Sequence, residues 1–160
     1  MSTTPMQRLA CVLKARPYRE RQRIAKQSGV GFSAVARALA GQQVKPGVYL
    51  KLCGALGISA RTGDAAPVRV LGDFDWNFFG LGFHLTRNMM NLRTVRQASK
   101  AIGEHVSSAT ISRLENNKPI SVNGLIAVCN FMKVDPEHYC GRSESSHVKR
   151  RSETREGATA

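Results

Sequence analysis

Apolar side chains recur every three or four residues along most of this chain, which is the period of an amphipathic helix. In the second half, Trp76, Phe79 and Phe83 follow this spacing. Asp75 and Ser107 stand before such runs, where a short polar side chain can cap unpaired backbone N–H groups. Sustained strand-like alternation is absent, so the pattern predicts an all-α fold of short helices. Further predicted boundaries lie at Thr4-Pro5, Lys45-Pro46, Gly57, Ser121 and Asp135-Pro136.

The large apolar side chains between 76 and 90 are predicted to lie in the core or at a contact between domains. Their helical spacing is more typical of packing than of a cofactor site. These residues are Trp76, Phe78, Phe79, Phe83, Met89 and Met90.

Composition divides the chain into segments. Residues 61–75 are rich in Gly, Pro, Ala and Asp, which is typical of a linker. Residues 141–160 lack apolar periodicity and are predicted to form a disordered basic tail. The remaining segments, 1–60 and 76–140, are predicted to be two helical domains.

The two helical segments align with each other at a constant offset of 76 residues without a gap. Ala25 then matches Ala101, and Cys53 matches Cys129. The shared apolar pattern predicts the same helices packed in the same order, as after a domain duplication.

Charge points to a polyanionic partner. The chain of 160 residues carries 24 Lys and Arg against 11 Asp and Glu, a net charge of +13. Residues 1–61 alone hold 11 basic residues and 1 acidic residue. Such an excess attracts nucleic acid, with an anionic membrane surface as the alternative. No apolar run approaches the roughly 20 residues needed to span a bilayer, and the N-terminus lacks the apolar core of a signal peptide. We therefore expect a soluble, cytoplasmic protein and no membrane-spanning segment.

Catalytic and metal-binding chemistry are not indicated. The four cysteines stand far apart, and no histidine lies near one at a ligand spacing. We therefore expect buried, reduced thiols and neither a metal nor a cofactor. No nucleophile and base set, paired carboxylates or phosphate-binding glycine loop can be assembled, so an enzyme is not predicted.

The most informative segment is Gln97–Glu115, QASKAIGEHVSSATISRLE. Two helices joined by a tight turn need a small residue where they touch and apolar residues after the turn. Ala101, Val106 and Ile111 meet these requirements. Ser107 is placed to cap the second helix, whose small polar side chains would fit a major groove.

With the TISRLEN run, Lys118-Pro119 and the apolar stretch VNGLIAVCNFM, residues 80–140 resemble the lambda-repressor-like helix-turn-helix family. The resemblance implies a bundle of about five helices whose Ser108–Asn116 helix enters the major groove. His105 stands where the family has a turn glycine. Either His105 is left-handed or the turn is re-registered around Gly103.

The resemblance implies base reading by Ser108, Ala109 and Arg113, helped by Ser112. It assigns phosphate contacts to Gln97, Asn116 and Lys118, and a structural role to Glu115. The candidate DNA-binding residues of this segment are Gln97, Ser107, Ser108, Ala109, Thr110, Ser112, Arg113, Asn116 and Lys118.

Residues 21–39 are a divergent version of the same motif, which implies two tandem lambda-repressor-like bundles joined by a linker. Its exposed helix positions are less polar, whereas its basic residues suit phosphate contacts. Phe32 could meet a thymine methyl or a protein partner. The candidate DNA-binding residues of this segment are Arg21, Lys26, Phe32, Ser33, Arg37 and Lys45.

The sequence thus predicts a DNA-binding transcriptional regulator of bacterial or phage type that recognises an operator in double-stranded DNA. One alternative is an antiactivator or adaptor that binds another regulator through residues 32–40. Another is nonspecific nucleoid binding, which needs only charge. Whether the chain also forms a homodimer is left open.

Overall fold

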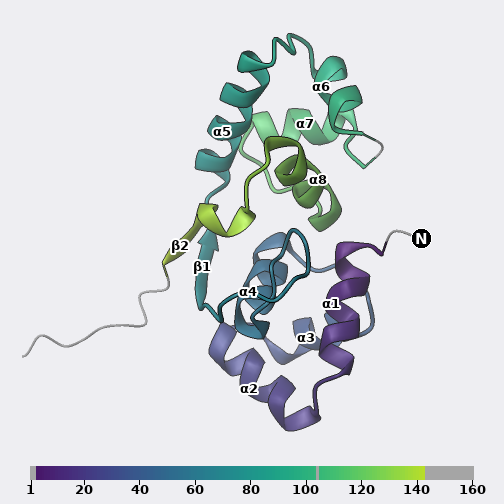
Figure 1. Cartoon of the computed structure of the whole chain (residues 1–160), viewed down its shortest axis with the longest axis vertical. Coiled ribbons are helices and arrows are strands. Elements are labelled where there is room, and N and C mark those ends of the chain that lie inside the picture. Colours follow the sequence, from purple (N-terminus) through teal and green to yellow (C-terminus); the bar gives the residue numbers. More distant parts are fainter. Residues whose placement is uncertain (1–2, 104, 143–160) are drawn as a thin grey trace, which may run out of the picture.

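The computed structural model describes residues 3–103 and 105–142, and the described chain is mostly helical (Figure 1). Four helices are followed by a short strand, four more helices, a 3-10 turn and a second short strand. In chain order these are α1 Pro5–Lys14, α2 Tyr18–Ser28, α3 Phe32–Leu39, α4 Pro46–Leu56, β1 Leu71–Phe74, α5 Trp76–Met89, α6 Val95–Ile102, α7 Ser108–Glu115, α8 Val122–Met132, η1 Pro136–Tyr139 and β2 Cys140–Arg142. Residues 143–160 of the predicted tail lie outside the described residues. Gly141 and Arg142, which are part of the same predicted disordered tail, instead belong to strand β2, because they pair with β1.

Short polar side chains set the starts of several helices. The Asp75 carboxylate accepts from the backbone N–H of Phe78 at 2.9 Å and begins α5. Ser107 and Ser121 cap α7 and α8 in the same way. At α1, Thr4 and Gln7 form a reciprocal capping box. The predicted starts at Thr4, Asp75, Ser107 and Ser121 are confirmed.

The two groups of four helices share an order of packing. In the first group α1 packs on α3 and α2 on α4, and in the second α5 packs on α7 and α6 on α8. The helices α3 and α7 begin 76 residues apart, as do α4 and α8. However, α2 ends at Ser28 and α6 at Ile102, 74 residues apart. The gapless alignment is therefore wrong before α7, because two extra residues lie between α6 and α7.

This insertion changes the turn between α6 and α7. Gly103 has φ +113° and ends α6. The turn is thus re-registered around Gly103. Ala101, predicted to touch the next helix, is exposed, and the fully buried small residue of α6 is Ala98.

Two short strands depart from the expectation of helices alone. Strand β1 pairs antiparallel with β2, with Leu71 opposite Arg142 and Phe74 opposite Cys140. Each strand is too short to produce a recognisable alternation. The partners are also far apart in the sequence, so neither segment alone indicates the pairing.

The predicted linker, residues 61–75, is packed rather than free. The backbone N–H of Arg69 donates to the Gly54 carbonyl at 2.9 Å, and that of Ala66 to the Gly57 carbonyl at 2.8 Å. A Cβ at Gly54 would lie 2.7 Å from the Arg69 carbonyl oxygen. Leu71 is also buried. Part of this segment therefore lies against α4.

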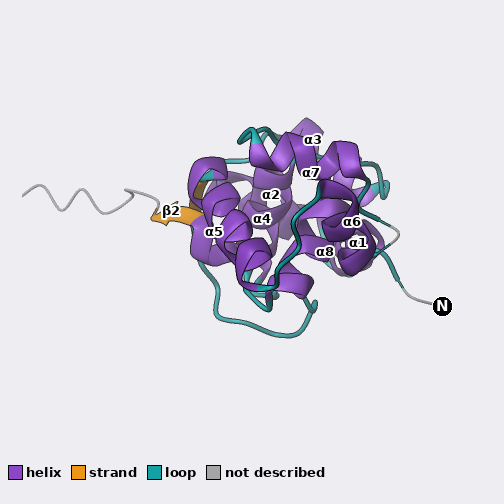
Figure 2. Cartoon of the chain, turned by 90° about the horizontal axis from the view of Figure 1, so that it is seen from above, coloured by secondary structure: helices purple, strands orange, loops and turns teal. Residues whose placement is uncertain are grey.

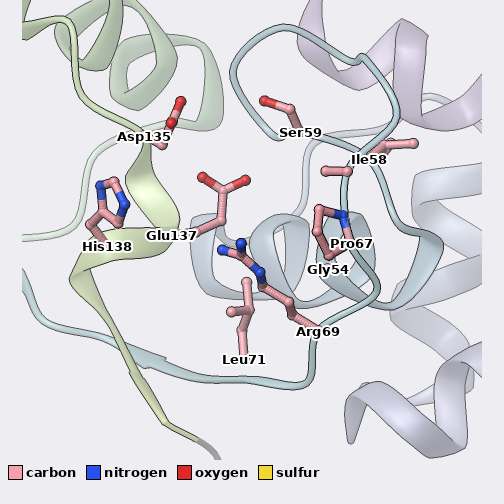
Figure 3. Close-up of a pocket in the computed structure, with 10 residues that line it drawn as sticks. Gly54, Ile58, Ser59, Pro67, Arg69, Leu71, Asp135, Glu137 and His138 are labelled. Carbon is pink, nitrogen blue, oxygen red and sulfur yellow. The ribbon is translucent and has the colours of Figure 1, made fainter.

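The two groups of helices meet along a polar and apolar junction. The Glu137 carboxylate accepts from the buried backbone N–H of Ala60 at 2.9 Å. Beside it, the Arg61 guanidinium pairs with Asp135 at 2.8 Å. Figure 3 shows Glu137 pointing into a cavity of about 160 Å³, with Arg69 on the opposite wall. Helix α8 also contacts α1 and α4, so one apolar core continues through both groups.

The predicted core of α5 is only partly correct. Phe79 and Phe83 are fully buried, and Trp76 is half-buried. Phe78, Met89 and Met90 are instead exposed, because the core covers only one side of this helix.

The four cysteine side chains also differ in burial. Cys53 and Cys129 are buried as predicted and Cys140 is half-buried, whereas Cys11 is exposed; all four are free thiols. Cys11 therefore departs from the prediction of four buried cysteines.

Candidate nucleic-acid interface

The helices α3 and α7 lie on the same side of the molecule. Both are on the side turned away from the viewer in Figure 1, and both lie toward the upper edge in Figure 2. The loop between α4 and β1 lies at the opposite, lower edge in Figure 2. One surface thus presents the second helix of both predicted motifs.

Helix α7 is fixed by its inner side and its first turn. Ile111 and Leu114 are fully buried. The Ser107 hydroxyl accepts from the backbone N–H of Thr110 at 3.2 Å and lies 3.0 Å from the Thr110 hydroxyl. These two predicted DNA-binding side chains therefore also have a local capping role.

The outer side of α7 carries small side chains. Ala109 and Ser112 are exposed, and Ser108 is half-buried at the start of the helix. None of these three side chains projects far from the backbone, so another surface can approach α7 closely. A major groove is such a surface.

Arg113 and Asn116 make contacts that stabilise the end of α7. The Arg113 guanidinium donates through Nε and Nη2 to the Pro119 carbonyl, at 3.2 and 3.0 Å. The Asn116 amide donates to the Ser112 carbonyl at 2.7 Å. The Arg113 side chain is thereby directed toward the loop after α7, while Lys118 in that loop is exposed.

Gln97 lies in the first turn of α6, where its Oε1 accepts from the backbone N–H of Thr94 at 3.0 Å. This capping box uses the amide oxygen and leaves the amide NH₂ as a donor. The Ser99 hydroxyl donates to the Val106 carbonyl at 2.6 Å and connects α6 to the start of α7. The Ser99 contact was not predicted from the sequence, because the gapless alignment did not contain the two extra residues that shift this turn.

An ion pair joins α7 to α5. Arg87 pairs with Glu115 and also donates to the carbonyls of Leu92 and Arg93, at 2.7 and 2.9 Å. The structural role expected for Glu115 is thus matched by a contact that connects α7, α5 and the loop after α5. These bonds limit the freedom of α7 to turn about its axis.

Helix α3 presents a different surface. Ser33 and Ala36 are exposed on it, and the exposed Phe32 ring meets the exposed Tyr18 ring edge to face, with centroids 5.8 Å apart. Arg37 donates to the Gln43 carbonyl at 3.3 Å. The α3 surface therefore combines an aromatic pair with small residues and one guanidinium.

Basic side chains surround this first group of helices. Lys26 and Lys45 are exposed, whereas Arg21 is half-buried. Other exposed cations that lack an ion-pair partner among the described residues are Lys14, Arg19 and Arg23. Because the only acidic residue in 1–61 is Glu20, which pairs with Arg16, the local field is strongly positive.

A groove of about 490 Å³ lies between the two groups. Gly29 and Lys45 line it from the first group, and Trp76 and Pro119 from the second. It therefore connects the turn before α3 to the loop after α7.

Within the described ranges, burial governs the acidity of two cysteine thiols. Burial raises the pKa of the Cys53 and Cys140 thiols to about 12, which keeps these thiols neutral and poorly nucleophilic. No group of three His, Cys, Asp or Glu side chains there could hold a metal ion. No helix there has the length and apolar content needed to cross a membrane.

Comparison of the chain with protein-family models, with curated proteins and with solved structures found no match. The family resemblance therefore rests on the residues quoted for 80–140. Function has to be argued from the surface that α3 and α7 present.

Proposed function

We propose that this chain is a sequence-specific DNA-binding transcriptional regulator that places α3 and α7 in the major groove of one duplex. The observation that carries the proposal is the position of both helices on one side of a molecule with one continuous core. Each follows a tight turn, and each exposes small side chains toward solvent. A helix of this kind is a common element for reading base edges.

The residues divide by role. Ala109, Ser108 and Ser112 approach the bases, because they lie on the outer side and first turn of α7. Lys118 contacts phosphate. Arg113, which is anchored to the Pro119 carbonyl, reaches DNA through the part of its guanidinium that this bond leaves free.

In the first group, charge provides affinity and α3 adds a second reading helix. Lys26, Lys45 and Arg37 supply sequence-independent attraction to the backbone. Because both groups share one core, the two reading helices have a fixed separation. We therefore expect two short recognition blocks at one constant spacing, bound by a single chain.

The test is selection of bound duplexes from a random pool at near-physiological salt, using the full chain and three matched variants. Ala109→Glu and Ala36→Glu add a carboxylate to the exposed sides of α7 and α3, which phosphates would repel. Ala65→Glu adds the same charge to the exposed loop on the opposite edge.

We expect the wild type and Ala65→Glu to enrich two blocks, and each helix variant to lose one of them. Enrichment of no sequence by the wild type would refute specific recognition. Blocks at variable spacing would refute the fixed separation of the two helices.

A second candidate function has one observation in its favour. The exposed Phe32 and Tyr18 pair is a surface suited to protein contact, as an antiactivator or adaptor would need. If Ala36→Glu leaves DNA selection unchanged, α3 serves this second function and α7 alone reads DNA.

A further inference from the structure

Helix α5 carries an unusual concentration of exposed apolar side chains. Nine large hydrophobic residues are exposed in the described part of the chain, and five of them lie between 78 and 90. Four of these, Phe78, Leu81, Leu85 and Met89, are 54–87 % exposed and define what we call the α5 stripe. An apolar patch of this kind on a folded protein usually marks an interaction site.

The stripe follows one side of the helix. Its members are separated by three, four and four residues, so they lie along a single line on a helix of 3.6 residues per turn. Phe79 and Phe83 occupy the opposite side and are fully buried. Helix α5 thus has two apolar sides. The core uses one of them, and on the other Phe78 contacts the Tyr139 ring, with ring centroids 5.1 Å apart.

Helix α5 itself presents no exposed Lys or Arg beside the stripe. The exposed neighbours on one flank are Asn77, His84 and Asn88, with His84 Nε2 3.1 Å from Asn88 Nδ2. The nearest basic residue on the helix, Arg87, is largely buried in its pair with Glu115. In a chain of net charge +13, this face is therefore one that a second copy can approach without strong like-charge repulsion.

The sequence that follows Arg142 is mostly polar. Residues 143–160 contain Val148 as their single large apolar residue, among several Ser, Glu, Lys and Arg. A membrane surface is also a poor match, because helices that lie on anionic lipid place Lys and Arg beside the apolar face. A depletion of charge together with Phe and Met is instead typical of the centre of a protein interface.

The order of residues within the stripe is close to palindromic. An antiparallel pair of α5 helices related by a two-fold axis would place Phe78 against Met89 of the second copy, and Leu81 against Leu85 of that copy. The first pairing is centred midway between residues 83 and 84 and the second at Phe83, which is close to the common centre that a two-fold axis requires. A sulfur to aromatic contact and a leucine pair would then occur twice each.

We propose that the chain forms a symmetric homodimer through the α5 stripe. The stripe shares no residue with α3 or α7. An interface made by one pair of helices buries an area at the small end of the range for stable interfaces. We therefore expect a dimer Kd in the micromolar range. This inference concerns self-association and stands independently of DNA binding.

Sedimentation velocity of the full chain without DNA tests the proposal, over concentrations from about 1 to about 200 μM in moderate salt. Leu85→Glu places a carboxylate at the centre of the stripe, and Leu81→Glu does so at the paired position. Val68→Glu is the matched control, because Val68 is an exposed apolar residue, 69 % accessible, outside the stripe. Circular dichroism checks that each variant is folded.

We expect the wild type and Val68→Glu to shift from the 17.5 kDa chain mass toward twice that value as concentration rises. Both stripe variants should remain monomeric at every concentration and keep their helical spectrum. A wild type that stays monomeric throughout would overturn the proposal. Equal dissociation by Val68→Glu and the stripe variants would overturn it as well, because charge and not position would then be the cause.

Discussion

Replacement of Glu137 by alanine is expected to weaken the junction between the two groups of helices. The Glu137 carboxylate accepts from the Ala60 backbone N–H at 2.9 Å, and Ala60 is fully buried. Alanine removes this acceptor and leaves the Ala60 N–H without its protein partner. Loss of a hydrogen bond to a charged group, with a buried donor left unpaired, costs about 1.5–3 kcal/mol.

Urea denaturation followed by circular dichroism measures this cost. With a denaturant slope of about 2 kcal/mol/M, the midpoint of Glu137→Ala should fall by roughly 0.7–1.5 M. Because one core continues through both groups, the wild type should unfold in a single transition. Glu137→Gln is the matched control, since its amide oxygen can still accept from the same N–H and should retain more than half of the lost stability.

Two results would refute this reasoning. A Glu137→Ala midpoint equal to that of the wild type would mean that the contact contributes nothing to the junction. An equal fall for Glu137→Gln and Glu137→Ala would show that the charge matters and the hydrogen bond does not.

Three further predictions test other parts of the structure. Lys118→Ala should weaken binding to every duplex and reduce the slope of log affinity against log salt by about one unit; an unchanged slope in binding titrations would exclude its phosphate contact. Gly80→Ala should destabilise the fold by about 1–3 kcal/mol, because its Cβ would lie 2.9 Å from the Leu114 carbonyl oxygen. Gly47→Ala, which meets nothing within 4 Å, is the control and should not lower the urea midpoint. Burial raises the pKa of Cys53 to about 12, above the unfolded thiol pKa of about 8.5. The contribution of its neutral form to folding is therefore complete below about pH 8.5 and is lost as the pH rises toward 12. A urea midpoint that does not fall between about pH 7.5 and pH 10 would contradict this prediction.

The sequence by itself determined where most helices begin. Thr4, Asp75, Ser107 and Ser121 each cap a helix through a side chain that reaches only three residues along the chain. Such interactions are local, so the residue type and its neighbours suffice to predict them. The inner side of α7 was equally readable, because its helical period does not depend on what packs against it.

The candidate site was predictable only in outline. Spacing placed Ala109 and Ser112 on the outer side of α7, but it could not show that the Arg113 guanidinium is bonded to the Pro119 carbonyl. The two predicted motifs were also aligned without a gap, because the apolar pattern is intact on both sides of the two extra residues before Val106. Only the positive φ of Gly103 locates the turn.

Tertiary structure alone decided how the two groups are joined. The pairing of Leu71 with Arg142 and the bond from Ala60 to Glu137 connect residues about half the chain apart, and no local preference encodes such contacts. The same holds for α5, whose two apolar sides are equivalent in sequence until the core covers Phe79 and Phe83 and leaves the α5 stripe exposed. Local hydrogen bonding fixes where helices start, whereas the choice of buried side depends on which distant segments pack against them.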